Sequence, residues 1–300
     1  MERPLRVLFV ASECAPFARE GALGDVVGAL PAALRRRGVD ARVVIPRFGW
    51  ISPVSTDGMS KHLAPLGVPL GDAEAWCAVY EAPLPGSDAP VYMLDHEVLF
   101  DRPYLYDPRG GVAHDNLARF AFLSRGAFQL AKHLGWVPDV MHAHDWPTGL
   151  VPLYLDTLER GAMFRRTAGV LTVHGVGHQG RFPADEFRVT QLDDAVARSA
   201  PVEDHGGVNL LKAAIHHAAK VVTVARRYAD DIRTQSAGAG LGAMLAARGD
   251  AVCGLFDEGE AIDWDVAAAR LVDVYRDAVM IRRGASVTPP ASVFPETDPR

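Results

Sequence analysis

Short, continuous apolar runs recur along this chain, and segments with a helical spacing of apolar residues separate them. A strand with one face in water alternates apolar and polar side chains, whereas a strand covered by helices on both faces is apolar throughout. Buried strands that alternate with helices form β–α–β units, whose strands are parallel and whose crossovers are right-handed. The chain is therefore predicted to be an α/β protein with a doubly wound, mostly parallel sheet. The predicted buried strands are 6–11, 41–46, 90–95, 139–144, 168–174, 220–225 and 251–256.

Two regions depart from this alternation. Residues 61–95 contain strand patterns separated by polar and Pro-Gly turns, which predicts an antiparallel hairpin beside the main sheet. The last residues, 284–300, are rich in proline and poor in large apolar side chains, so they are predicted to be a flexible tail. The predicted helices are 25–37, 116–134, 148–160, 207–219 and 225–234.

The net charge and the cysteine content limit the binding partners and the cellular compartment that we expect for this protein. The net charge is −6, which argues against nucleic acid as a partner because phosphate backbones select basic surfaces. Cys14, Cys77 and Cys253 are far apart and odd in number, so we expect no disulfide framework and a cytoplasmic location. No segment reaches the roughly 20 apolar residues of a membrane helix, so no membrane association is expected. The apolar N-terminal run is interpreted as a first strand rather than a signal peptide.

A glycine-bearing loop joins the first predicted strand to the first predicted helix. Ligands of doubly wound sheets bind beyond the carboxyl ends of the strands, where this loop lies. Arg19, Gly21 and Asp25 are its candidate binding residues, because loop N–H groups and the positive end of a helix can hold an anion. Asp25 is also expected to cap the helix. The loop has neither the G-x-G-x-x-G nor the G-x-x-x-x-G-K-[ST] spacing, so a structural turn is the simpler interpretation of the loop alone.

Two further polar segments, "HAHDWPTGL" and "LTVHGVGHQGRF", follow predicted strands. Asp145 and Trp146 stand at a strand tip, where a carboxylate can accept from sugar hydroxyls and an aromatic ring can stack on a sugar. Thr148 is expected to cap a helix. His174 ends a strand before a glycine-rich loop, from which it could donate to a hydroxyl or act as an acid or base. His142 and His144 point the same way from one predicted strand, but no third residue has the spacing of a known metal site, so no metal is predicted. For each histidine of these segments, the structural alternative is a side chain that only packs or caps its own loop.

These segments, taken in order, resemble those of bacterial glycogen synthases and plant starch synthases (glycosyltransferase family five). "ASECAPFAREGALGDVVGALPAAL" is similar to the family's opening, which ends K-T-G-G-L-A-D-V-V-G-A-L-P, and "DVMHAHDWPTGLVPLYL" is similar to its D-V-V-H-A-H-D-W motif. "VLTVHGVGHQGRF" resembles V-F-T-I-H-N-x-x-Y-Q-G. "VNLLKAAIHHAAKVVTVARRYADDI" resembles F-L-K-A-G-I-x-x-A-D-x-V-T-T-V-S-P-x-Y-A-x-E-I. The resemblance spans about residues 5–256.

The resemblance implies the Rossmann-like first half of the two-domain GT-B fold. It also implies a metal-free, retaining transfer of glucose from ADP-glucose to an α-1,4-glucan or malto-oligosaccharide, with no cofactor. In the family, the lysine of the opening motif reaches the donor diphosphate, the aspartate of H-A-H-D-W lies near the acceptor, and the histidine of T-I-H-N lies against the transferred glucose. By motif these implied roles fall on Arg19, Asp145 and His174, the last as the candidate catalytic residue. Gly21 and Asp25 match residues of the opening motif.

Several positions depart from the family motifs. Arg19 stands where the family has lysine, and its planar fork reaches differently. Glu20 places a negative charge beside the proposed phosphate site, and Ala22 adds a Cβ where the backbone should approach the ligand. Gly175 and His178 replace the asparagine and tyrosine of the third motif. We therefore expect this chain to bind ADP-glucose weakly.

The resemblance stops where the family's second domain would begin. The R-L-x-x-Q-K-G and E-P-C-G-L motifs of that domain do not occur, and residues 258–283 resemble the family's last helix, which crosses back onto the first domain. We expect 1–257 to form an acceptor-side domain with this helix packed on it and the donor domain missing. An unrelated amphipathic helix is the alternative for 258–283. Two functions are open: a glucosyltransferase that needs a partner chain at the exposed cleft face, or a non-catalytic glucan-binding or regulatory protein.

Overall fold

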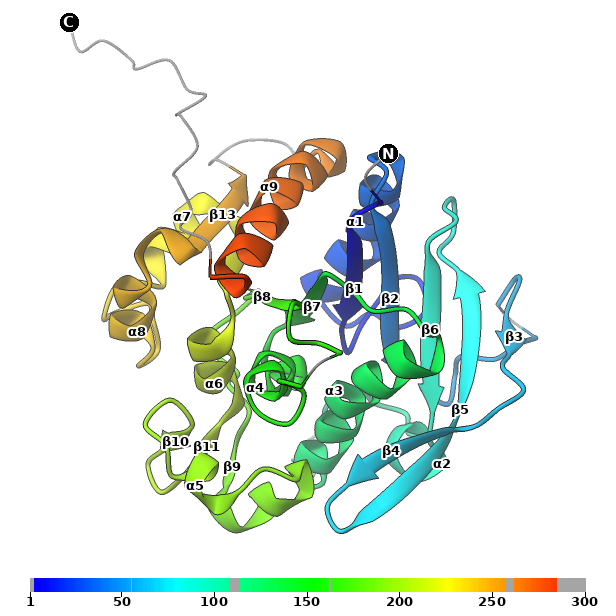
Figure 1. The fold of residues 1–300 in the computed structure, drawn as a ribbon, viewed down its shortest axis with the longest axis horizontal. Coiled ribbons are helices and arrows are strands. Elements are labelled where there is room, and N and C mark those ends of the chain that lie inside the picture. The colour runs from blue at the N-terminus through cyan, green and yellow to red at the C-terminus, as the bar shows by residue number, and fades with distance from the viewer. Residues whose placement is uncertain (1–2, 55, 108–113, 162, 257–261, 285–300) are drawn as a thin grey trace, which may run out of the picture.

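The computed structural model describes residues 3–54, 56–107, 114–161, 163–256 and 262–284 (Figure 1). Its strands are β1 (Arg6–Val10), β2 (Asp40–Pro46), β3 (Ser60–Lys61), β4 (Leu66–Leu70), β5 (Ala73–Pro83), β6 (Pro90–Asp95), β7 (Val140–His144), β8 (Ala168–Thr172), β9 (Arg181–Pro183), β10 (Glu203–Asp204), β11 (Gly207–Asn209), β12 (Lys220–Ala225) and β13 (Val252–Phe256). Its α-helices are α1 (Ala22–Arg36), α2 (Glu97–Phe100), α3 (Asn116–His133), α4 (Leu150–Asp156), α5 (Asp194–Ala197), α6 (Leu210–His217), α7 (Arg226–Asp231), α8 (Gly242–Ala247) and α9 (Trp264–Arg282). Its 3-10 helices are η1 (Trp146–Thr148), η2 (Ala184–Thr190) and η3 (Gly249–Ala251).

Ten of the described strands form one sheet in the order β13-β12-β8-β7-β1-β2-β6-β5-β3, with β4 paired to β5, and β10, β11 and β9 form a separate three-stranded sheet. The strands from β13 to β6 in this order are parallel, and β3, β4 and β5 form an antiparallel arm at one end. From β1 the chain builds outward to β2 and β6, and then continues on the other side of β1 with β7 and β8. The boundary between β1 and β7 is therefore the topological switch point, where doubly wound sheets bind ligands.

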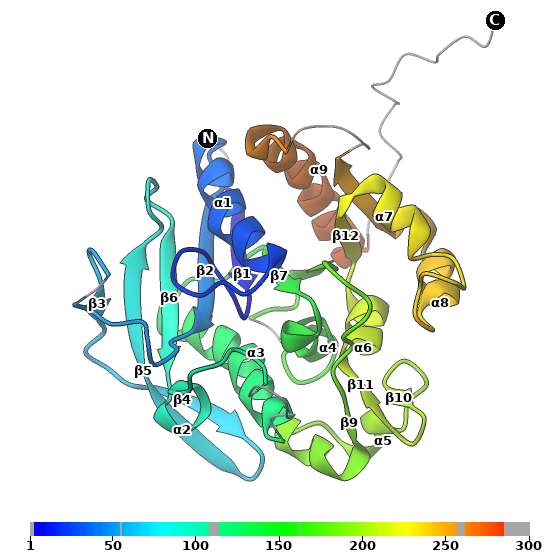
Figure 2. The ribbon, with the colours of Figure 1, turned by 180° about the vertical axis from the view of Figure 1, so that it is seen from behind.

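Helices cover both faces of the parallel sheet, which confirms the predicted fold class. Helices α1 and α9 pack against each other, as both views show, and α3, α4 and α6 pack together (Figures 1 and 2). Because α1 and α4 belong to right-handed crossovers that run in opposite directions along the sheet, they lie on opposite faces. Every residue of β7 and β8 is buried, which explains why these strands are apolar apart from His142, His144 and Thr172.

The C-terminal helix α9 shares the core of the sheet domain. Asp263 caps its first turn, as its side chain accepts from two backbone N–H groups of the helix. Tyr275 is fully buried, and its hydroxyl lies 2.7 Å from Nδ1 of His142 on β7. Arg36, at the end of α1, donates to the carboxylate of Asp265 at 2.8 Å. Side chains of α9 therefore contact both the sheet and the first helix.

Two predicted helix caps are wrong. Helix α1 begins at Ala22 with Gly21 as its N-cap, so Asp25 lies inside the first turn and its carboxylate binds a neighbouring arginine instead. Thr148 caps no helix, because its hydroxyl turns back to the backbone of His144, accepting from the N–H at 2.6 Å and donating to the C=O at 2.9 Å. Such local bonds to the backbone compete with capping.

Two predicted features lie outside the described residues. Residues 257–261 contain the predicted domain limit, and residues 285–300 contain nearly all of the predicted tail. Within the described part of the chain, no helix is both long and apolar enough to cross a bilayer. The three cysteines are free thiols.

Candidate active site

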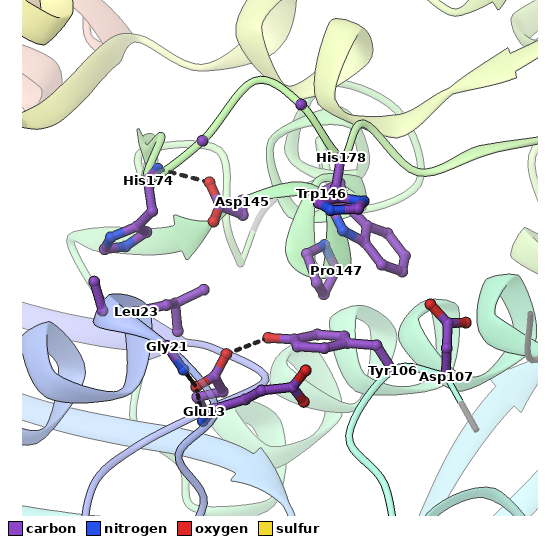
Figure 3. Close-up of a pocket in the computed structure, with 14 residues that line it drawn as sticks. Glu13, Gly21, Leu23, Tyr106, Asp107, Asp145, Trp146, Pro147, His174 and His178 are labelled. Carbon is purple, nitrogen blue, oxygen red and sulfur yellow. Dashed lines mark hydrogen bonds between the residues drawn. The ribbon is translucent and has the colours of Figure 1, made fainter. Parts of the chain in front are cut away.

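A cleft of about 450 Å³ opens beyond the carboxyl ends of β1, β7 and β8, at the switch point of the sheet (Figure 3). Of the predicted site residues, Gly21, Asp145, Trp146 and His174 line it. The described lining residues are Glu13, Glu20, Gly21, Ala22, Leu23, Tyr106, Asp107, Asp145, Trp146, Pro147, His174, Gly175, Gly177 and His178. Arg19 and Asp25, which were also predicted, are not among them.

Arg19 and Asp25 bind each other at the edge of the opening loop. Arg19 Nε lies 2.5 Å from one carboxylate oxygen of Asp25, and Nη2 lies 2.8 Å from the other. The pairing raises the pKa of Arg19 and lowers that of Asp25. Both side chains are exposed, so the pair contributes little to stability. Its main consequence is that the cation of the loop already has an internal partner.

Glu13, which the motifs did not single out, occupies the N–H groups of the opening loop. Its Oε2 accepts from the backbone N–H of Glu20 at 2.6 Å and of Gly21 at 3.0 Å, and its Oε1 accepts from the hydroxyl of Tyr106 (Figure 3). The side chain is buried. Two N–H groups directly before α1 therefore bind an anion that belongs to the protein itself. In the sequence, only its position as an acidic residue shortly after an apolar strand indicated that Glu13 could belong to the site.

Tyr106 reaches the cleft from a loop that Arg119 holds in place. The fully buried guanidinium of Arg119 donates to the backbone carbonyls of Leu99 at 2.8 Å, Leu105 at 2.8 Å and Tyr106 at 3.2 Å. Burial lowers the pKa of Arg119 to about 10. Burial and the charge of Glu13 raise the pKa of the Tyr106 hydroxyl, so it remains a donor. No local pattern marks Tyr106, because its partner Glu13 is 93 residues away in sequence.

Asp145 joins the tips of β7 and β8. Its Oδ1 accepts from the backbone N–H of His174 at 2.7 Å (Figure 3). Its backbone φ of 53° lies in the left-handed region, which non-glycine residues rarely adopt. Burial, supported by the charge of Glu13, raises the pKa of Asp145 to about 7 against the opposing effect of the N–H groups of His174 and Gly175. Near neutral pH this carboxyl group can therefore be either charged or protonated.

Trp146 is partly packed against aromatic side chains and partly open to the cleft. Its ring centroid lies 5.0 Å from that of Phe120 and 5.9 Å from that of Phe182. Gly180 permits this packing, because a Cβ there would lie 2.6 Å from the indole ring, and its φ of +63° also favours glycine. The loop after β8 thus holds the tryptophan in the wall of the cleft.

His174 is the outermost of three neighbouring histidines. The ring centroids of His142 and His144 are 4.4 Å apart, and those of His144 and His174 are 5.4 Å apart. Burial lowers the pKa of His142 to about 3 and of His174 to about 4, and it lowers the pKa of His144 strongly as well. All three rings are therefore neutral near pH 7. Among the described residues, no group of three or more His, Cys, Asp or Glu could hold a metal ion.

The motif order, the doubly wound sheet and the position of the cleft agree with the profile of one family. The sequence model of the starch synthase catalytic domain family matches residues 6–247 of this chain. The chain belongs to this family. It is 40% identical over 263 residues to glycogen synthase 1 of Geobacter sulfurreducens, covering 87% of this chain and 52% of that protein. It is 35% identical over 266 residues to the glycogen synthase of Treponema denticola, covering 87% of this chain and 53% of that protein.

A solved member of the starch synthase family has a similar fold. The catalytic domain of starch synthase IV from Arabidopsis thaliana, bound to ADP and acarbose, matches with a TM-score of 0.77 and 27% identity over 84% of this chain and 51% of that one. The predicted resemblance and the predicted Rossmann-like half of the GT-B fold are thus confirmed. The chain spans about half the length of these starch and glycogen synthases.

Proposed function

We propose that this chain takes part in glucosyl transfer from ADP-glucose to an α-1,4-glucan, as in glycogen synthesis, and forms the glucan-facing wall of the site. Membership of the starch synthase family supports the reaction. The similar plant enzyme was solved with ADP and acarbose, which supports the two ligand classes. The observation that carries the assignment of the wall is the chemistry of the cleft lining.

The described lining of the cleft contains carboxylates but no lysine or arginine. The carboxylates belong to Glu13, Glu20, Asp107 and Asp145, beside the aromatic ring of Trp146. Acidic groups accept hydrogen bonds from neutral sugar hydroxyls, whereas they repel a diphosphate. This wall therefore suits a glucan better than the charged end of ADP-glucose.

Transfer would then use a second wall that carries cations. Stabilisation of a departing diphosphate needs preorganised positive groups, and Arg19 is engaged by Asp25. In this proposal residues 1–257 form the acceptor-side domain, and a donor-binding domain from a longer polypeptide or a partner chain faces the cleft. His174 lies against the transferred glucose, as the catalytic residue, and Asp145 lies on the glucan side. The free thiols fit a cytoplasmic location for this reaction.

Two contacts within the opening loop, the Arg19–Asp25 ion pair and the bonds of Glu13 to backbone N–H groups, favour a second candidate function. Because Glu13 fills the N–H groups of the loop and Asp25 binds its cation, a chain that only binds glucan would need no change in this wall. Such a protein would regulate or assist a synthase without transferring glucose. Both candidate functions require glucan binding, but only the first includes transfer of glucose.

Calorimetric titration with maltoheptaose tests the shared part of both candidates. We expect binding in the millimolar range or tighter, weakened about tenfold in Trp146→Ala, because stacking on an aromatic ring contributes on the order of 1–2 kcal/mol. Trp76→Ala is the matched control, since Trp76 is exposed on β5 in the antiparallel arm, outside the cleft lining. Absence of binding, or equal loss in both variants, would contradict the assignment of the wall.

Incorporation of glucose from ADP-[14C]glucose into glycogen separates the two candidates. Transfer predicts incorporation that falls to background in His174→Ala. Maltoheptaose binding without incorporation by the full-length protein would instead leave the glucan-binding candidate. A titration with ADP-glucose measures the donor side, where we expect weak binding, and a dissociation constant in the low micromolar range would contradict the acidic wall.

A further inference from the structure

His144 has a ring nitrogen that the fold leaves without a partner. The side chain is fully buried, and its Nδ1 lies 3.1 Å from Nε2 of His174. Its Nε2 is also buried, and no described residue offers it a hydrogen bond. The ring stacks against Phe9, whose centroid is 5.5 Å away, and lies beside His142. Both nitrogens of His142 have other partners, so His142 does not compensate for the unpaired atom.

The unpaired nitrogen determines which histidine donates. A neutral imidazole carries one hydrogen, so one nitrogen donates and the other accepts. If His174 donated from Nε2, the hydrogen of His144 would sit on its own Nε2, as a buried N–H with no acceptor. If His144 donates from Nδ1, its Nε2 keeps only an unpaired lone pair. Buried N–H groups without acceptors are the rarer and costlier case. His144 therefore donates to His174.

This direction of donation fixes the hydrogen of His174 as well. Because Nε2 of His174 accepts, its single hydrogen sits on Nδ1, for which the described residues offer no hydrogen bond, on a side chain that lines the cleft. We propose that His144 is a positioning residue that fixes His174 as an N–H donor toward the ligand. The ligand class rests on the proposed function, in which the acceptor is a hydroxyl oxygen of the glucan or of the transferred glucose. A neutral His174 in this tautomer offers the cleft no lone pair, so it does not act as a general base.

The tautomers can be measured directly without any ligand. In protein labelled with [15N]histidine near neutral pH, long-range 1H–15N correlations distinguish the protonated from the bare ring nitrogen. We expect His174 and His144 each to carry the hydrogen on Nδ1, in roughly tenfold or greater excess over the other form. His178 is the internal control, since it is exposed on the same cleft and should show the ordinary mixture in which Nε2–H dominates. A His174 protonated on Nε2 would overturn the proposal.

The variant His144→Phe tests whether His144 is the cause. It keeps a ring beside Phe9 and removes the donor, so the His174 tautomers should shift toward the mixture of His178. If His174 stayed on Nδ1 alone, burial rather than His144 would set its tautomer, and the proposal would be wrong. Maltoheptaose or ADP-glucose should then move the Nδ1 signal of wild-type His174. If neither ligand moves it, the proposed function is contradicted, whereas the ligand-free tautomers of the wild-type protein can overturn the donation from His144 to His174 even if the variant does not fold.

Discussion

Replacing Asp145 by asparagine removes a half-buried carboxyl group but keeps an oxygen that can accept from the N–H of His174. Burial raises the pKa of Asp145 from 3.8 to about 7. Between these values the folded protein holds a proton that the unfolded chain has released, so stability falls as pH rises through this range. One pKa unit corresponds to about 1.4 kcal/mol, so the full range lowers the free energy of unfolding by roughly 4 kcal/mol. The Asp145→Asn protein should lack this loss, and the isosteric substitution keeps the same backbone branching at this positive-φ position.

Urea unfolding of both proteins at about pH 5 and about pH 8 measures the effect. Wild type should lose roughly 2–3 kcal/mol more between the two pH values than Asp145→Asn, because part of the loss has already occurred by the lower pH. The lowered pKa of His174 affects stability in the same range, but this contribution is common to both proteins and cancels. Asp107→Asn is the matched control, since it removes an exposed carboxyl group from the same cleft.

Parallel pH profiles of the two proteins would contradict the prediction. If wild type and Asp145→Asn lost the same free energy of unfolding between the two pH values, the surroundings of the carboxyl group would not raise its pKa. A pH-dependent difference of equal size in Asp107→Asn would refute it too, since the effect would then follow net charge rather than burial.

Three further substitutions test the supports of the cleft. Arg119→Met should lower the free energy of unfolding by about 3 kcal/mol or more, measured in urea, because three backbone carbonyl groups lose their charged donor at about 1–3 kcal/mol each. Tyr275→Phe should lower it by about 1–3 kcal/mol, because Nδ1 of His142 loses its partner, and a change below a few tenths would contradict that contact. Gly180→Ala should shift the fluorescence of Trp146 and cost about 1 kcal/mol or more, since the added Cβ meets the indole, and an unchanged spectrum would argue against this packing.

The sheet was predictable because its strands are buried on both faces. Residues 140–144 and 168–172 are buried without exception, and residues 168–171 form a continuous apolar run, whereas the alternating His142 and His144 of the other strand are buried polar side chains. The antiparallel arm was predictable from its turns. The first residues of helices were harder to predict. Asp25 is a residue type that often caps helices, but the helix begins one turn earlier, at Ala22.

The candidate site was predictable only where topology brings strand ends together. Asp145 and His174 follow neighbouring strands, so their meeting in one cleft follows from the strand order. The pairing of Arg19 with Asp25 depends on side-chain directions in a loop, which no periodicity encodes. Glu13 was missed because its partners include Tyr106, which arrives from a distant loop with no pattern of its own.

The contact between α1 and α9 also bears on how the chain folds as it is made. Arg36 and Asp265 are 229 residues apart, so the first helix waits for nearly the whole described chain before its partner emerges from the ribosome. Contacts at such separation form late and slow folding. During synthesis the groove that α9 later fills over β7 and β8 is open and apolar, and His142 lacks Tyr275. Until α9 docks, the nascent chain therefore exposes this apolar groove to water.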